Sequence, residues 1–342
     1  MKKVLSLLLS FVMLFTLSLS FGFEAQAKTS QLDIQRKQFN SQNAHYNYSG
    51  KTFVKTKHNY DTNYTTVMLS SSLNKKGKKF KVYGGVENLA LNGKYIYYYN
   101  SDSWELIRAK KNGKGKKTIA KSTGYCENAN IPFIIDGKYI AYNIIERDSL
   151  GYYSSLYACK LNGKGKKKIA SGVISDFYTY KGNLYYIKGS KLYKYSFKKK
   201  KAKALKVKMN FKNKAIVGME NNKLYVFKEL DSYGNYKEPY HANLAVYVVD
   251  VNKKNVKLVT KAYNQETEFI HEVFIYKGRV YFSIGTGGGN GVNRVNNGKY
   301  DKDYEVGDLA GGEDGIGYYN GKPIFKICNF KNGNISYKNA NL

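Results

Sequence analysis

The sequence is poor in the residues that build covalent frameworks, metal sites and common catalytic centres. Its 342 residues include only three cysteines, three prolines, four histidines and one tryptophan. Three widely spaced cysteines without a CxxC pair are typical neither of a disulfide framework nor of a structural zinc site. His-Glu-x-x-His and Gly-x-Ser-x-Gly motifs are missing, so the common metallohydrolase and serine-hydrolase patterns are excluded. The sequence therefore predicts no catalytic residues, no metal site and no cofactor.

Acidic residues are also scarce. Asp and Glu number 25 against 57 Lys and Arg, which gives a formal net charge of +32. Such a charge attracts anionic surfaces and polymers, although lysine can also serve solubility alone. Aromatic residues make up 15% of the chain, which argues against a disordered polycation. We therefore expect a folded protein whose partner is anionic.

Long apolar runs are confined to the N-terminus, which excludes a polytopic membrane protein. Met1–Lys3 is basic, residues 4–23 are almost wholly apolar, and Ala25-Gln-Ala27 is a small-x-small cleavage pattern. This arrangement predicts a secretory signal peptide over residues 1–27, with an uncleaved anchor as the alternative. The expected mature protein is secreted, extracellular and associated with the cell wall, with no transmembrane span after cleavage.

A motif of a tight turn followed by a tyrosine-rich or β-branched segment recurs about every 45 residues. The turn positions are Gly50, Gly93, Gly137, Gly182, Asn222, Gly278 and Gly321. A second segment follows each turn: residues 106–120 align without gaps on 156–170 and on 246–260. Each unit therefore reads as two hairpins, and hence as four antiparallel strands.

Four-stranded units at this spacing predict an all-β chain with a single β-propeller over residues 49–342. Seven turn positions favour seven blades, while six would result if the units at Gly278 and Gly321 merged. Residues 28–48 are expected to be a linker or a strand that closes the ring.

The tyrosine-rich segment Tyr95–Asn100 and the following segment Leu106–Gly113 resemble the blade repeat of low-density-lipoprotein-receptor-type (YWTD) β-propellers. The chain is most similar to a secreted bacterial family of unknown function with propellers of this kind. The tryptophan of the eukaryotic motif is absent, so the ligand and calcium contacts of that family are not carried over. The resemblance implies a fold and export, and no activity.

In an antiparallel blade, the first-to-second and third-to-fourth turns emerge at one end of the propeller. We call this end the turn face and expect it to be strongly basic. The lysines predicted to bind an anionic polymer there are Lys78, Lys79, Lys114, Lys116, Lys117, Lys164, Lys166, Lys167 and Lys168.

The second-to-third loops should emerge at the opposite end, which we call the loop face. The long loops expected there cover residues 58–64, 101–105, 146–153 and 231–241. These loops are richer in carboxylates and aromatic residues, and such side chains grip proteins, peptides or glycans. The alternative is that the aromatic side chains pack under their own loops. The predicted ligand residues are Tyr64, Trp104, Tyr152, Tyr153, Tyr233 and Tyr236.

These observations together indicate an exported, non-catalytic propeller that binds an anionic cell-wall polymer or acidic glycan on its turn face. A protein, peptide or glycan would bind the loop face. Nucleic-acid recognition modules are missing and arginine is scarce, so sequence-specific nucleic-acid binding is not expected. The alternatives are a propeller enzyme, a lyase or hydrolase acting on glycan or peptide, and a purely structural scaffold.

Overall fold

A computed structural model describes residues 52–339 of the chain, except for several short segments. The segments left out are 73–74, 124–132, 149–150, 173, 213, 230–243, 263–267, 287–288, 297–298, 306–315, 320–321 and 330–333. The expected signal peptide and the expected ring-closing segment 28–48 therefore lie outside the described residues. Among the residues that are described, no helix has the length and apolarity that a membrane span requires.

The described strands form seven consecutive antiparallel sheets, five with four strands and two with three. Blades 1 to 3 comprise β1 (Phe53–Asn59), β2 (Tyr64–Ser70), β3 (Lys78–Tyr83); β4 (Val86–Asn92), β5 (Tyr95–Asn100), β6 (Glu105–Lys110), β7 (Lys117–Lys121); and β8 (Phe133–Asp136), β9 (Tyr139–Asp148), β10 (Gly151–Lys160), β11 (Lys167–Ser171). Blades 4 and 5 comprise β12 (Ile174–Tyr180), β13 (Asn183–Lys188), β14 (Lys191–Ser196), β15 (Lys201–Ala204); and β16 (Lys214–Glu220), β17 (Lys223–Glu229), β18 (Leu244–Asp250), β19 (Asn255–Ala262). Blades 6 and 7 comprise β20 (Glu268–Tyr276), β21 (Arg279–Thr286), β22 (Gly289–Asn296), β23 (Lys299–Glu305); and β24 (Ile316–Tyr319), β25 (Lys322–Asn329), β26 (Asn334–Asn339).

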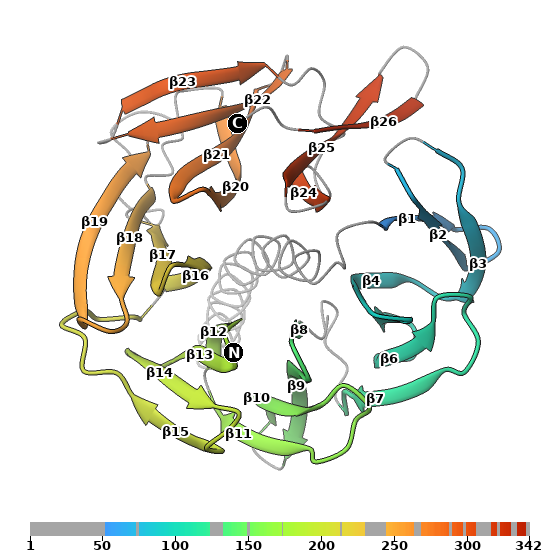
Figure 1. Cartoon of the computed structure of the whole chain (residues 1–342), viewed down its shortest axis with the longest axis horizontal. Coiled ribbons are helices and arrows are strands. Elements are labelled where there is room, and N and C mark those ends of the chain that lie inside the picture. Colours follow the sequence, from blue (N-terminus) through green and yellow to red (C-terminus); the bar gives the residue numbers. More distant parts are fainter. Residues whose placement is uncertain are drawn as a thin grey trace, which may run out of the picture.

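The seven sheets follow one another around a ring, with the first strand of each four-stranded blade near the centre and the last at the perimeter (Figure 1). This architecture is a β-propeller, as the repeat predicts. The units at Gly278 and Gly321 lie in separate sheets, so they do not merge into one blade. The sheets of the described residues therefore agree with seven blades rather than six.

Blade 1 is described from its second strand onward. Its β1–β2 connection lies at the same end as the β5–β6 connection of blade 2, because Asn63 Nδ2 donates a hydrogen bond of 2.6 Å to Asp102 Oδ2. The three strands of blade 1 thus correspond to the second, third and fourth strands of the other blades. The Gly50 turn, which should precede them, lies outside the described residues.

The core lies between neighbouring blades, and tyrosine supplies much of it. Tyr97 and Tyr99 of blade 2 pack with Ile140 and Tyr142 of blade 3, and each of these side chains is almost wholly buried. At the edge of this interface, Tyr97 Oη donates a 3.1 Å hydrogen bond to the carbonyl oxygen of Leu161 in blade 3. Tyrosine suits this position because the ring is buried while its hydroxyl reaches the polar edge.

The gapless alignment of the second repeat segment is confirmed by a shared irregularity. Pairing of the third with the fourth strand shifts register after Leu106 in blade 2, after Leu156 in blade 3 and after Val246 in blade 5. These three residues are the aligned first positions of the repeat segment. A bulge at a matching place in each blade is typical of a repeated structural unit.

Candidate functional site

The two sets of turns meet at one end of the propeller, as antiparallel order requires. A backbone N–H of the third-to-fourth turn donates to a carbonyl of the first-to-second turn in blades 2, 3, 4 and 5. These hydrogen bonds are Lys111 to Lys94 and Leu161 to Lys138 at 3.1 Å, and Phe197 to Gly182 and Val251 to Asn222 at 3.2 Å. The turn face is therefore a single, internally bonded surface in these four blades.

The third-to-fourth turns of blades 2 and 3 have the same conformation. In blade 2, Asn112 Oδ1 accepts the N–H of Lys114 at 3.1 Å, and Gly113 and Gly115 have positive φ angles of 79° and 63°. Blade 3 repeats this with a 3.0 Å bond from Lys164 N–H to Asn162 Oδ1. Glycine takes these left-handed positions without strain. The lysines that alternate with the glycines are thereby held in solvent.

The predicted polymer-binding lysines all have exposed side chains, but they differ in their contacts. Lys167 Nζ donates at 2.9 Å to the carbonyl of Lys200 in the next blade, and Lys168 forms an ion pair with Glu146. Lys166 lies 4.5 Å from the centre of the Tyr157 ring. Lys114, Lys116, Lys117 and Lys164 are exposed at or just after the turns of blades 2 and 3.

Carboxylates at the turn face are engaged with backbone groups. Asp136 Oδ2 accepts the N–H of Gly182 at 2.8 Å, and Glu220 Oε2 accepts the N–H of Gly278 at 2.6 Å. Asp250 accepts the backbone N–H groups of Asn252 and Lys253 within its own turn. The hydrogen bond from Lys253 is the largest cause of the lowered pKa of Asp250. Asp136 and Glu220 thus link turns of adjacent blades, whereas Asp250 stabilises its own turn.

A pocket of about 450 Å³ lies on the turn face between blades 2 and 3. Four of its lining residues are cationic and none is acidic: the cations are Lys94, Arg108, Lys138 and Lys160. The Arg108 guanidinium lies 4.5 Å from the centre of the Tyr95 ring, and its buried Nε has no hydrogen-bond partner. The pocket therefore has a cationic lining.

Lys94 and Lys138 belong to the turns at Gly93 and Gly137, which the sequence predicts to lie on the turn face, whereas Arg108 and Lys160 were not among the predicted site residues. Arg108 lies within strand β6 and Lys160 ends strand β10, so neither belongs to a turn. They meet because blade 3 packs beside blade 2, and no local pattern in the sequence encodes that contact. The one signal in the sequence was a charged residue between the apolar Ile107 and Ala109, both of which are buried in β6.

The loop face differs from expectation in blade 3. The segment 146–153 is not a long loop, because β9 continues to Asp148 and β10 begins at Gly151. Tyr152 and Tyr153 thus lie on β10 and pair with Arg147 and Glu146. The extra aromatic residues extend the hairpin ladder, since such side chains suit a pleated surface. Tyr233 and Tyr236 lie outside the described residues.

The other predicted aromatic residues of the loop face have contrasting environments. Tyr64 is 40% exposed and meets Tyr83 edge to face, with ring centres 5.4 Å apart. Trp104 is half-buried, has a positive φ of 55°, and packs against the core between blades 2 and 3. The alternative that an aromatic side chain packs under its own loop therefore fits Trp104, while Tyr64 remains accessible.

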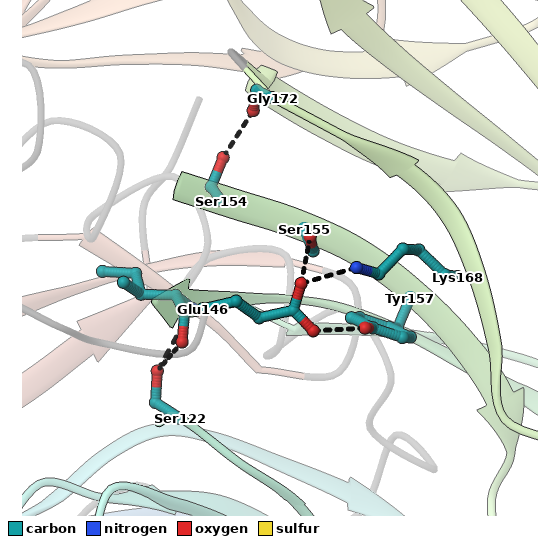
Figure 2. Close-up of polar contacts among 8 residues, drawn as sticks. Ser122, Glu146, Ser154, Ser155, Tyr157, Lys168 and Gly172 are labelled. Carbon is teal, nitrogen blue, oxygen red and sulfur yellow. Dashed lines mark hydrogen bonds and ion pairs between the residues drawn. The ribbon is translucent and has the colours of Figure 1, made fainter. Parts of the chain in front are cut away.

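A polar cluster on blade 3 ties three adjacent strands together (Figure 2). Glu146 of β9 accepts hydrogen bonds of 2.6 Å from Ser155 Oγ on β10 and from Lys168 Nζ on β11, and Tyr157 Oη donates to its other oxygen. Burial opposes ionisation of Glu146, but these hydrogen bonds outweigh it and lower its pKa from 4.5 to about 2. The Glu146 carboxylate accepts all three hydrogen bonds, so the cluster holds strands β9, β10 and β11 together.

Replacing Glu146 with Gln is expected to lower the free energy of unfolding by about 1–3 kcal/mol at pH 7, because buried donors lose a charged acceptor. The folded-state pKa of Glu146 is depressed, so its contribution is complete above pH 4.5 and declines as pH falls toward 2. Denaturant titrations of both proteins across this window measure the difference. A matched Glu105→Gln variant, which loses a single 3.3 Å contact with Thr118, should change stability less. A difference between wild type and Glu146→Gln that does not shrink at low pH would contradict this assignment.

Cys159 and the acidic residues offer no metal centre in the described part of the chain. Cys159 is free and buried, and burial raises the pKa of its thiol to about 11. Among the described residues, no group of three or more His, Cys, Asp or Glu side chains is positioned to hold a metal ion.

No protein-family model and no curated protein sequence matches this chain. Solved structures are similar in fold. The acylaminoacyl peptidase of Pyrococcus horikoshii matches with a TM-score of 0.52 and 12% identity, over 85% of this chain and 49% of that one. The β-propeller domain of Cps50 (Swd1) from Myceliophteria thermophila gives 0.48 and 12% over 84% and 99%. BamB from Moraxella catarrhalis gives 0.47 and 9% over 84% and 81%. At such identities the likeness concerns the fold alone, which the seven sheets of the described residues identify as a β-propeller.

Proposed function

We propose that this protein is an exported β-propeller that binds an anionic polymer at the cell surface through its turn face. The supporting observation is the arrangement of charge at that face. Exposed lysines follow identical turns in blades 2 and 3, while Asp136 and Glu220 at the same end are occupied by backbone N–H groups. Cations near a polyanion act together, because each displaces counterions from the polymer.

The loop face would bind a second partner, a protein or glycan. Tyr64, Tyr83 and Tyr60 are exposed there or beside it, with Tyr60 88% accessible. Exposed aromatic side chains provide rigid, amphipathic contact area for a protein or glycan. The module would then connect a wall polymer on one end to a partner on the other, without catalysis.

Binding of wild-type protein to a soluble glycerol-phosphate polymer is expected to weaken steeply with salt. With about six lysine contacts, the association constant should fall roughly 10³-fold between about 50 and 200 mM salt. Fluorescence titration at four or five salt concentrations gives the slope, and a neutral dextran of similar length is the control ligand. An affinity that does not depend on salt over this range would contradict the proposed function.

A further inference from the structure

The same side-chain-to-backbone hydrogen bond joins adjacent blades at two interfaces of the propeller. The last residue of the first strand carries a carboxylate, which accepts the N–H of the second turn residue in the next blade. Asp136 of blade 3 does this to Gly182 of blade 4, and Glu220 of blade 5 does it to Gly278 of blade 6. At these two places an anion supplied by the chain itself therefore occupies the junction between adjacent turns.

The junction between blades 2 and 3 has no such anion, and its turn differs in conformation, because Gly182 and Gly278 have positive φ angles of 73° whereas Lys138 does not have a positive φ. The residue that ends the first strand of blade 2 is Asn92, which pairs with Tyr95 just as Asp136 pairs with Tyr139. The second turn residue of blade 3 is Lys138. Both Asn92 and Lys138 line the pocket of about 450 Å³ described above. The neutral side chain leaves the position of the carboxylate without a negative charge.

Cations line this uncharged position from two strands and two turns. Arg108 belongs to β6 and Lys160 to β10, while Lys94 and Lys138 belong to the turns of blades 2 and 3. Without an acidic lining residue, these four positive charges repel one another. The Arg108 guanidinium lies against the Tyr95 ring and hydrogen-bonds the Tyr97 side chain, which fixes its plane, while its Nε has no hydrogen-bond partner.

We propose that this pocket binds a phosphate group carried on a polyol or sugar, at a junction where Asn92 stands in the strand position that a carboxylate has in Asp136 and Glu220. A phosphate offers more oxygens and more negative charge than a carboxylate, which suits four converging cations and a guanidinium fork. The whole pocket, of about 450 Å³, is within the size range of ordinary small-molecule sites. This inference rests on the proposed function, since it names the chemical unit of the polymer that the turn face recognises.

The probe is glycerol 3-phosphate, titrated into the full-length chain by calorimetry at low salt, with inorganic phosphate and glucuronate as comparison ligands. We expect glycerol 3-phosphate to bind about tenfold more tightly than glucuronate. Equal binding of glucuronate would overturn the phosphate assignment. Binding of inorganic phosphate at comparable strength would support a site for the phosphate group itself.

Two variants test the site. Asn92→Asp places the chain's own carboxylate where Asp136 stands in blade 3, and should weaken glycerol 3-phosphate binding about a hundredfold through like-charge repulsion. Arg108→Gln should weaken it at least about tenfold, through loss of a charged donor. The matched control is Lys194→Gln, because Lys194 pairs with Tyr185 in blade 4 as Arg108 pairs with Tyr97, and it also removes one positive charge. Lys194→Gln should bind as wild type does.

Unchanged binding by Asn92→Asp, with its fold verified by circular dichroism, would overturn the proposal. So would equal losses in Arg108→Gln and Lys194→Gln, which would indicate a general charge effect.

The outcomes for the pocket and for the proposed function are separable. Failure of glycerol 3-phosphate to bind, with polymer binding retained and salt-dependent, rejects the pocket alone. Binding of glycerol 3-phosphate with salt-independent polymer binding rejects the polymer function alone.

Discussion

A protein in which Lys114, Lys116, Lys117 and Lys164 are all replaced by Gln is expected to lose roughly 10³-fold in affinity for a glycerol-phosphate polymer. Each cation near a strongly anionic surface contributes about 1 kcal/mol, and 1.4 kcal/mol corresponds to a tenfold change in affinity. The four side chains are exposed at or just after turns. The loss should therefore arise from charge and leave the fold intact.

The matched control replaces four exposed lysines at the other end of the propeller, namely Lys121, Lys188, Lys191 and Lys208. Its net charge equals that of the turn variant, so bulk attraction to the polymer is reduced equally. Fluorescence titrations at one low salt concentration compare the three proteins. If both variants lose the same affinity, the charge acts as a uniform coat and a one-sided binding face is ruled out.

Removal of the Asp176 side chain is expected to have the largest effect on stability. Asp176 is 7% exposed; its Oδ1 accepts the N–H of Phe177 and its Oδ2 accepts the N–H of Ile216, both at 2.7 Å. The second bond joins the first strands of blades 4 and 5 near the centre of the ring (Figure 1). Asp176→Ala leaves two buried N–H groups without their acceptor, at a cost of about 1–3 kcal/mol each. We expect the free energy of unfolding to fall by about 2–5 kcal/mol.

Urea denaturation followed by circular dichroism measures this loss. Asp176→Asn keeps one acceptor oxygen and should recover part of it. Asp61→Ala, at an exposed turn, should alter stability by less than about 0.5 kcal/mol and serves as the control. A stability of Asp176→Ala within that same margin of wild type would show that the contact between the two blades contributes little.

The predictable part of this protein is the part that repeats. The Gly93, Gly137, Gly182 and Gly278 turns, the tyrosine-rich second strands and the Asn-Gly-Lys-Gly turns are local, because a tight turn needs left-handed residues and a half-buried strand needs aromatic or β-branched ones. Local rules applied at regular spacing predicted the propeller and favoured seven blades over six. The long loop predicted at 146–153 was wrong, since extension of a hairpin depends on pairing between β9 and β10.

The sequence by itself determined that blades form and that most of their turn positions are basic. Only the tertiary structure decided which residues line the pocket, because Arg108 and Lys160 come from different strands, Lys138 comes from a turn, and the three meet across a blade interface. The blade 3–4 junction has the carboxylate of Asp136, whereas the blade 2–3 junction has the neutral Asn92 at the matching strand position and a different turn conformation. The difference between a charged Asp136 and a neutral Asn92 affects the junction only because the next blade's turn packs against these residues, since the energy of a charge depends on its neighbours in space.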